Sequence, residues 1–256
     1  MIRGEVTSYI DVAQIVLYAF FAFFAGLIYY LRREDRREGY PLESEAAGRQ
    51  KERGFLLIPT PKTFQLAHGA AVSAPRFDVD SRVLKAAKVE PWPGAPLTPT
   101  GDPMKAEVGP GAYALRADVA EQTFDGRDLI VPLRIATNYA VAKEDANPIG
   151  MPVVGADRAV GGIVRDVWVD RSESLVRYYE VEAGPAGATK RVLLPATFAN
   201  VRARRVQVDS ILGAHFADVP TTRSPDKVTS LEEEKIMAYY GAGTLYATPA
   251  RAEPLL

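Results

Sequence analysis

The sequence predicts one membrane-spanning α-helix near the N-terminus, followed by a mainly-β cytoplasmic domain that contains a small β-barrel and ends in a C-terminal helix. Three observations predict this fold. A run of twenty uncharged residues, 12–31, is long enough to cross a bilayer. Short runs rich in β-branched residues follow one another from about residue 129, separated by turn residues. A single helical segment with an N-terminal capping pattern begins near residue 229.

The uncharged run 12–31 matches the thickness of a membrane. At about 1.5 Å per residue, a helix of this length spans about 30 Å. Gln14 is its only strongly polar residue, and Tyr29 and Tyr30 lie at its far end, where interfacial aromatic residues gather. A buried helix of a soluble protein is the alternative, but uncharged runs this long are rare in such cores. The helix also carries side chains that suit either lipid contact or packing against other helices: Phe20, Phe21, Phe23, Phe24 and Gly26.

The residues after the span indicate a permanent anchor rather than a cleaved signal peptide. The apolar run exceeds the roughly 7–15 residues of a signal peptide, and no small-residue cleavage site follows it. Arg3 is the only basic residue before the span, whereas four arginines follow it closely: Arg32, Arg33, Arg36 and Arg37. This asymmetry predicts that residues 1–11 lie outside and that the C-terminal side is cytoplasmic. We expect the four arginines and Tyr30 to contact anionic phospholipid headgroups at the membrane surface.

Residues 32–110 are predicted to form a proline-rich, extended segment on the membrane surface. Ten of the nineteen prolines lie between Pro41 and Pro110, which excludes long helices and central strands here. A disordered linker would explain the prolines, but the segment also keeps large apolar residues such as Phe55, Phe64 and Trp92. We therefore expect it to lie across another protein surface and the membrane face.

Residues 111–256 are predicted to form the cytoplasmic domain. Four strand-like runs with short connections predict a meander: residues 163–170, 176–182, 190–194 and 205–209. Two further segments, residues 130–135 and 150–154, also fit strands. Short strands separated by turn signals indicate a small barrel or a strongly bent sheet.

The C-terminal helix of this domain is marked by its capping residues. A capping box pairs either Thr229 with Glu232 or Ser230 with Glu233. The two glutamates suit the positive end of the helix dipole, and they are also candidates for proton transfer, with the capping role the stronger interpretation. Gly241 is expected to end the helix.

The composition excludes several classes of protein. With 31 Lys and Arg against 32 Asp and Glu, the net charge of −1 argues against a nucleic-acid partner. The absence of cysteine excludes disulfides, iron–sulfur clusters and thiolate nucleophiles. Two histidines, His68 and His215, are too few for a multi-histidine metal centre, and no phosphate-binding or hydrolase motif occurs. We predict no catalytic residues, no metal site and no enzymatic activity.

The acidic residues offer the most specific chemistry. Asp166, Asp170 and Glu173 occupy one strand–turn–strand unit together with Arg165 and Arg177. Carboxylates that are half-buried at an interface have raised pKa values and can pass protons near neutral pH. The alternative is a solvated hairpin with ordinary surface ion pairs, and composition alone favours that alternative.

Five motifs of the chain resemble the H subunit of purple-bacterial photosynthetic reaction centres. They are residues 30–42 (YLRREDRREGYPL), 61–64 (PKTF), 99–104 (PTGDPM), 167–173 (VWVDRSE) and 239–247 (YYGAGTLYA). The resemblance runs in order along the whole chain and includes the single span.

The resemblance implies a membrane anchor with a PRC-type β-barrel domain that binds no pigment itself. It implies partners in the L and M subunits, which hold bacteriochlorophylls, bacteriopheophytins, quinones and a non-haem iron. A cytochrome subunit and light-harvesting antenna can accompany them. Such a subunit caps the L and M core on the cytoplasmic side of the bacterial inner (intracytoplasmic or chromatophore) membrane, with a periplasmic N-terminus. It shields the quinone sites and helps conduct protons to the secondary quinone.

The resemblance also bears on individual residues. The family's proton-path acids match Asp170 and Glu173, with Arg177 beside them. Some members carry surface histidines where this chain has residues 125–128 (DGRD), so Asp125 and Asp128 are the candidates for collecting protons here. Two alternative functions remain open: a stand-alone, membrane-tethered PRC-barrel adaptor for assembly or binding, and a tethered hydrolase.

Overall fold

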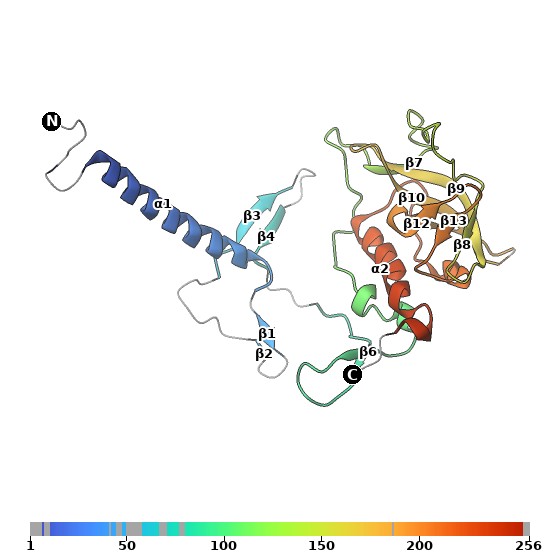
Figure 1. Ribbon diagram of the computed structural model, residues 1–256, viewed down its shortest axis with the longest axis horizontal. Helices are drawn as coiled ribbons and strands as arrows, with labels where there is room; N and C mark the ends of the chain where they lie inside the picture. The colour runs from blue at the N-terminus through green and yellow to red at the C-terminus, as the bar shows by residue number, and fades with distance from the viewer. Residues whose placement is uncertain are drawn as a thin grey trace. The chain divides into compact units, whose positions relative to one another are not determined.

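The computed structural model describes two compact units of the chain. The described residues are 7, 11–40, 42–44, 48–49, 58–66, 71–76, 80–185 and 187–252. The units comprise Met1–Arg82 and Val83–Leu256 and are considered separately (Figure 1). The division places residues 83–110, the last part of the predicted extended segment, in the second unit. The predicted N-terminal segment 1–11 lies almost entirely outside the described residues, as do Phe55 and His68.

The first unit begins with the predicted apolar helix. Helix α1 (Val12–Glu34) continues into a 3-10 turn, η1 (Asp35–Arg37). Asp11 caps it by accepting a 2.7 Å hydrogen bond from the Gln14 backbone N–H, and the Gln14 side chain accepts one from the Asp11 N–H at 3.3 Å. The stretch Val12–Arg37 is strongly apolar, and none of the residues in its most apolar part is buried. By length and composition, the helix can cross a membrane.

Two small antiparallel ladders follow the helix in the first unit. One pairs β1 (Glu43–Ser44) with β2 (Gly48–Arg49), and the other pairs β3 (Lys62–Gln65) with β4 (Ala71–Ala74). The strands of both ladders have at most four residues. Such short strands are what the proline-rich composition permits.

Arg37 ties the β3–β4 hairpin to the end of α1. Its side chain is only 9% exposed and donates to the Glu34 carboxylate at 2.8 and 3.0 Å. It also donates to the carbonyl oxygens of Thr60 at 2.8 Å and Ala74 at 2.9 Å. Lys62 adds a 2.7 Å contact to the same glutamate. The Arg37 side chain is therefore engaged within the chain, and its contact with phospholipid headgroups stays a prediction.

The second unit is built around one large sheet. Its strand order is β11-β10-β9-β8-β13-β12, and β7 pairs with β9. The strands are β7 (Ile130–Pro132), β8 (Pro152–Val154), β9 (Val160–Asp170), β10 (Leu175–Ala183), β11 (Lys190–Pro195), β12 (Ala199–Val201) and β13 (Val206–Val208). A separate ladder pairs β5 (Ala86–Lys88) with β6 (Leu97–Pro99). The predicted fold class is confirmed: one apolar helix, a mainly-β domain and a C-terminal helix.

The order of the strands differs from the predicted meander. Each of the six predicted runs overlaps a strand, but β13 pairs with β8 in parallel, so the sheet curls back on itself. Among the described residues, no ladder joins the end strands β11 and β12, and backbone hydrogen bonds do not close the barrel. Strand β12 and the β5–β6 ladder were not predicted.

The core lies between the curved sheet and helix α2 (Ser230–Tyr246) (Figure 1). Trp168 on β9 is 1% exposed, and Ile236 and Tyr240 of α2 are completely buried. Beside this core, Asp166 of β9 and Glu180 of β10 are buried charged residues that both pair with Arg134. The helix begins as predicted by the first alternative, because Thr229 and Glu232 form the reciprocal capping box.

Helix α2 does not end at Gly241, so that prediction was wrong. It continues to Tyr246 because its glycines serve close packing rather than termination. A Cβ atom at Gly241 would lie 2.5 Å from the Pro110 carbonyl oxygen. One at Gly243 would collide with the Ser210 carbonyl oxygen. The absence of side chains lets α2 approach both segments.

Replacing Gly243 by alanine is expected to destabilise the domain by about 1–3 kcal/mol, because a methyl group would be forced against backbone. This outweighs the better helix propensity of alanine, about 1 kcal/mol. Urea unfolding of the full chain in detergent measures the effect. The control is Thr244→Ala, an exposed position on the same turn. A Gly243→Ala chain as stable as wild type would show that α2 is not closely packed there.

Candidate functional site: acidic residues at the β9–β10 turn

The predicted proton-transfer residues lie mainly at one end of the large sheet. Strand β9 ends at Asp170, directly before the turn into β10, and Asp170 pairs with Ile130 at the start of β7. The Arg171 N–H donates to the Leu129 carbonyl at 3.0 Å. These contacts bring residues 121–128 beside the β9–β10 turn. The two acidic stretches that lie far apart in the sequence therefore meet.

Asp170 and Glu173 differ in how firmly they are held. Asp170 is 5% exposed, and its Oδ1 accepts the backbone N–H groups of Ser172 at 2.8 Å and Glu173 at 3.0 Å. This is an Asx turn, which explains how the sequence reverses here. The exposed Glu173 carboxylate makes no hydrogen bond or ion pair with the described part of the chain. A fixed acid beside a freely rotating one is a suitable arrangement for passing a proton.

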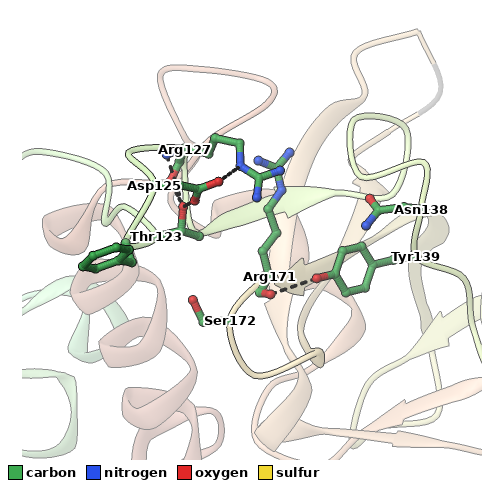
Figure 2. Close-up of a pocket in the computed structure, with 8 residues that line it drawn as sticks. Thr123, Asp125, Arg127, Asn138, Tyr139, Arg171 and Ser172 are labelled. Carbon is green, nitrogen blue, oxygen red and sulfur yellow. Dashed lines mark hydrogen bonds and ion pairs between the residues drawn. The ribbon is translucent and has the colours of Figure 1, made fainter.

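Asp125 is held in its ionised form. It accepts a 2.5 Å hydrogen bond from the Thr123 hydroxyl and pairs with Arg127 Nε at 2.6 Å (Figure 2). The Thr123 hydroxyl, and then Arg127, lower the pKa of Asp125 below its ordinary value. Asp125 can thus attract protons but holds them weakly. Asp128 joins the same loop through a backbone bridge to Gln122.

Glu233 forms a second buried acidic site at the N-terminus of α2. The Tyr178 hydroxyl donates to Glu233 Oε2 at 2.6 Å, and Arg177 Nη2 lies 3.5 Å from the same oxygen. Burial raises the pKa of Glu233, although Tyr178 and Arg177 offset part of the effect. Burial also raises the pKa of Tyr178. A buried carboxyl group with a raised pKa and a specific charged partner is a candidate functional group.

Glu232 has a capping role. Its Oε2 accepts the Thr229 backbone N–H at 2.9 Å, and its Oε1 accepts the Arg223 backbone N–H at 2.9 Å. Both oxygens are occupied by groups that hold the start of α2 in place. These contacts support the capping role of Glu232, which the sequence favoured over a role in proton transfer.

The structure separates residues that the sequence had grouped together. Asp166 is paired with Arg134 at 2.9 Å, whereas Arg165 pairs with Glu182 through its Nε at 2.7 Å. Each of the two is therefore paired with a residue that lies outside the β9–β10 turn. Sequence reasoning missed Tyr178 as the partner of Glu233, because the two lie 55 positions apart and no motif links them.

The raised pKa of Glu233 predicts a pH-dependent stability. A carboxyl group that binds its proton more tightly when folded supports stability below its unfolded pKa, and this support is lost as pH rises through the folded pKa. We expect the stability of wild type relative to Glu233→Gln to fall as pH rises above the ordinary value of 4.5. Urea unfolding across a pH series measures it.

The matched control for this pH series is Glu234→Gln, which removes one negative charge from the same helical turn. A wild-type curve that gains stability relative to Glu233→Gln over this range would contradict the inferred burial.

The described residues contain no group of three or more Asp, Glu or His side chains placed to hold a metal ion.

Two family models match the chain. Residues 4–135, more than half of the sequence, match the model of the photosynthetic reaction centre H-chain N-terminal region. Residues 140–214 match the PRC-barrel domain. The first match contains the apolar helix and β7, and the second contains β8 to β13.

Proposed function

The chain belongs to the photosynthetic reaction centre H-chain family, and we propose that it caps the L and M subunits, shields their quinone sites and helps conduct protons to the secondary quinone. The observation that carries this proposal is the position of the acidic residues at the β9–β10 turn in a chain that begins with an apolar helix, α1. The pigments, quinones and iron would be held by the partner subunits, and this chain would contribute contact surface and carboxylates.

The proposed anchor is α1, with its C-terminal end at the cytoplasmic surface of the bacterial inner membrane. The arginine asymmetry supports this orientation. We assign headgroup contact to the arginines that follow the span, Arg32, Arg33, Arg36 and Arg37, although the Arg37 side chain is only 9% exposed. Tyr30 would lie at the interface, where Lys62 Nζ is 5.7 Å from its ring centroid.

The proposed proton route begins at residues 125–128 and proceeds to the β9–β10 turn. Asp125 and Asp128 would collect protons, and Glu173 would pass them on because its carboxylate is free to rotate. Asp170, whose carboxylate is held by the backbone N–H groups of Ser172 and Glu173, would take part in proton transfer from a fixed position. Glu233, paired with Arg177, would serve as a buried proton-holding group. The contacts described above support this order of roles.

Purification through this chain tests the proposal. An affinity tag on the full chain should recover a pigmented complex with two larger hydrophobic subunits, and its absorption spectrum should show bacteriochlorophyll. The matched control is a tag on the L subunit, which should recover this chain in turn. A colourless, isolated chain from membranes that contain the pigments would contradict the proposal and favour a stand-alone adaptor.

A further inference from the structure

A small pocket lies beside the β9–β10 turn, and Asp125 is the only one of its lining residues to which the proposed proton route gives a role. Its volume is about 230 Å³. The lining residues come from three segments, as Figure 2 shows: Thr123, Phe124, Asp125, Arg127, Asn138, Tyr139, Arg171 and Ser172. Three segments distant in sequence thus form one concave surface.

The charges that line the pocket are unbalanced. Two arginines, Arg127 and Arg171, face one carboxylate, that of Asp125. Arg127 already pairs with this carboxylate at 2.6 Å. The guanidinium group of Arg171 has no hydrogen-bond or ion-pair partner in the described part of the chain, and Figure 2 shows it extending toward the Arg127 side chain. The pocket therefore offers planar donors for an added carboxylate.

The backbone that carries Arg171 is held firmly in place. Its N–H donates to the Leu129 carbonyl at 3.0 Å, and its own carbonyl accepts the Tyr139 hydroxyl at 2.8 Å. The next residue, Ser172, is fixed by Asp170. The Arg171 side chain thus extends from a rigid base, which reduces the entropy lost when it binds a ligand.

Two observations favour a protein side chain as the ligand. The pocket is smaller than the roughly 300–1,000 Å³ typical of small-molecule sites. In addition, Phe124 at its edge is fully exposed. A free anion would leave this ring in water, whereas a protein partner could bury it. Aromatic and arginine side chains on one patch are typical of interface hot spots.

We propose that this pocket docks an Asp or Glu side chain of a reaction-centre core subunit, with Phe124 inserted into an apolar depression of the same subunit. This inference rests on the proposed function, which supplies the partner. Arg171 makes the main contact, and Arg127 adds to it while keeping its pair with Asp125. Phe124, Arg127 and Arg171 are together called the Phe124–Arg171 patch.

Dissociation of the chain from the purified pigmented complex tests the inference. Arg171→Gln and Phe124→Ala should each weaken association by about tenfold or more. Arg171→Lys should give an intermediate effect, because lysine keeps the charge but lacks the planar fork. Raising salt should weaken the wild-type complex more than the Arg171→Gln complex, while Phe124→Ala should keep the wild-type salt dependence.

The control is Arg204→Gln, an exposed arginine outside the patch, which should dissociate as wild type does. Each variant chain is also compared with wild type by its unfolding midpoint, so that weaker binding is not confused with misfolding. If wild type forms the pigmented complex and the patch variants dissociate like the control, the inference is wrong while the proposed function stands. If wild type forms no such complex, the proposed function itself fails.

Discussion

Truncating Glu180 to alanine is expected to destabilise the β-domain by about 1–3 kcal/mol, because it would leave the buried Trp168 indole N–H without an acceptor. Glu180 lies on β10 and is 4% exposed. Its Oε2 accepts Arg134 Nη1 at 2.7 Å and the Trp168 indole N–H at 3.1 Å. Its Oε1 accepts Arg191 Nη1 at 2.6 Å. Removing this carboxylate therefore takes an acceptor away from three donors, and one of them, the Trp168 indole N–H, lies in the core.

The comparison variants separate this network from general charge effects. Glu182→Ala removes a more exposed glutamate from the same strand, and we expect little change because its ion pair with Arg165 is open to solvent. Glu180→Gln keeps the shape and one acceptor, so its effect should be intermediate. Urea unfolding of the full chain in detergent, followed by tryptophan fluorescence, measures all three. A Glu180→Ala chain that unfolds at the wild-type midpoint would contradict the structural role of the network.

Glu180 also shows where prediction from sequence stops. The alternation of residues 176–182 was enough to place this glutamate on a strand. This alternation could not indicate that Arg134, 46 positions earlier, would form an ion pair with Glu180. Side-chain partners at such separations depend on how strands are ordered in the sheet, and local patterns carry no information about that order.

The same distinction applies to the fold as a whole. The apolar helix, six of the strands and the capping box of α2 follow from local signals, namely the uncharged run, β-branched residues and Thr229 with Glu232. The parallel pairing of β13 with β8 has no local signal. Gly241 misled the prediction because a glycine that ends a helix and one that permits close packing look identical in a sequence.

In the candidate site, residue type and the family resemblance were enough to identify the acidic β9–β10 turn. The geometry of this turn follows from local sequence. Asp170 accepts backbone N–H groups two and three residues ahead, a pattern that Asp commonly forms at turns. The role of Arg37 could not be predicted in this way. Its carbonyl partners at Thr60 and Ala74 are contributed by the β3–β4 hairpin, and a cluster of arginines after a span more readily indicates lipid headgroups.

Removing the two acids of the turn is expected to slow proton uptake that accompanies the second electron transfer to the secondary quinone. An amide cannot accept and release a proton at neutral pH, so Glu173→Gln should slow uptake by about tenfold and the double variant with Asp170→Asn by about a hundredfold. Asparagine is the correct replacement for Asp170, because its Oδ1 can still accept the Ser172 and Glu173 N–H groups. Glu173→Gln should leave the fold unchanged, since this exposed carboxylate makes no hydrogen bond or ion pair within the described residues.

The measurement is flash-induced proton uptake by the purified complex, recorded with a pH-indicator dye. Glu182→Gln removes an acid of equal charge from β10, away from the turn, and should retain the wild-type rate. The first electron transfer should be unaffected in every variant, which separates a lost proton path from a damaged complex. Wild-type uptake rates in both single variants and in the double variant would remove Asp170 and Glu173 from the route. The proton path would then have to pass through other groups, with Glu233 and Tyr178 as the next pair to test.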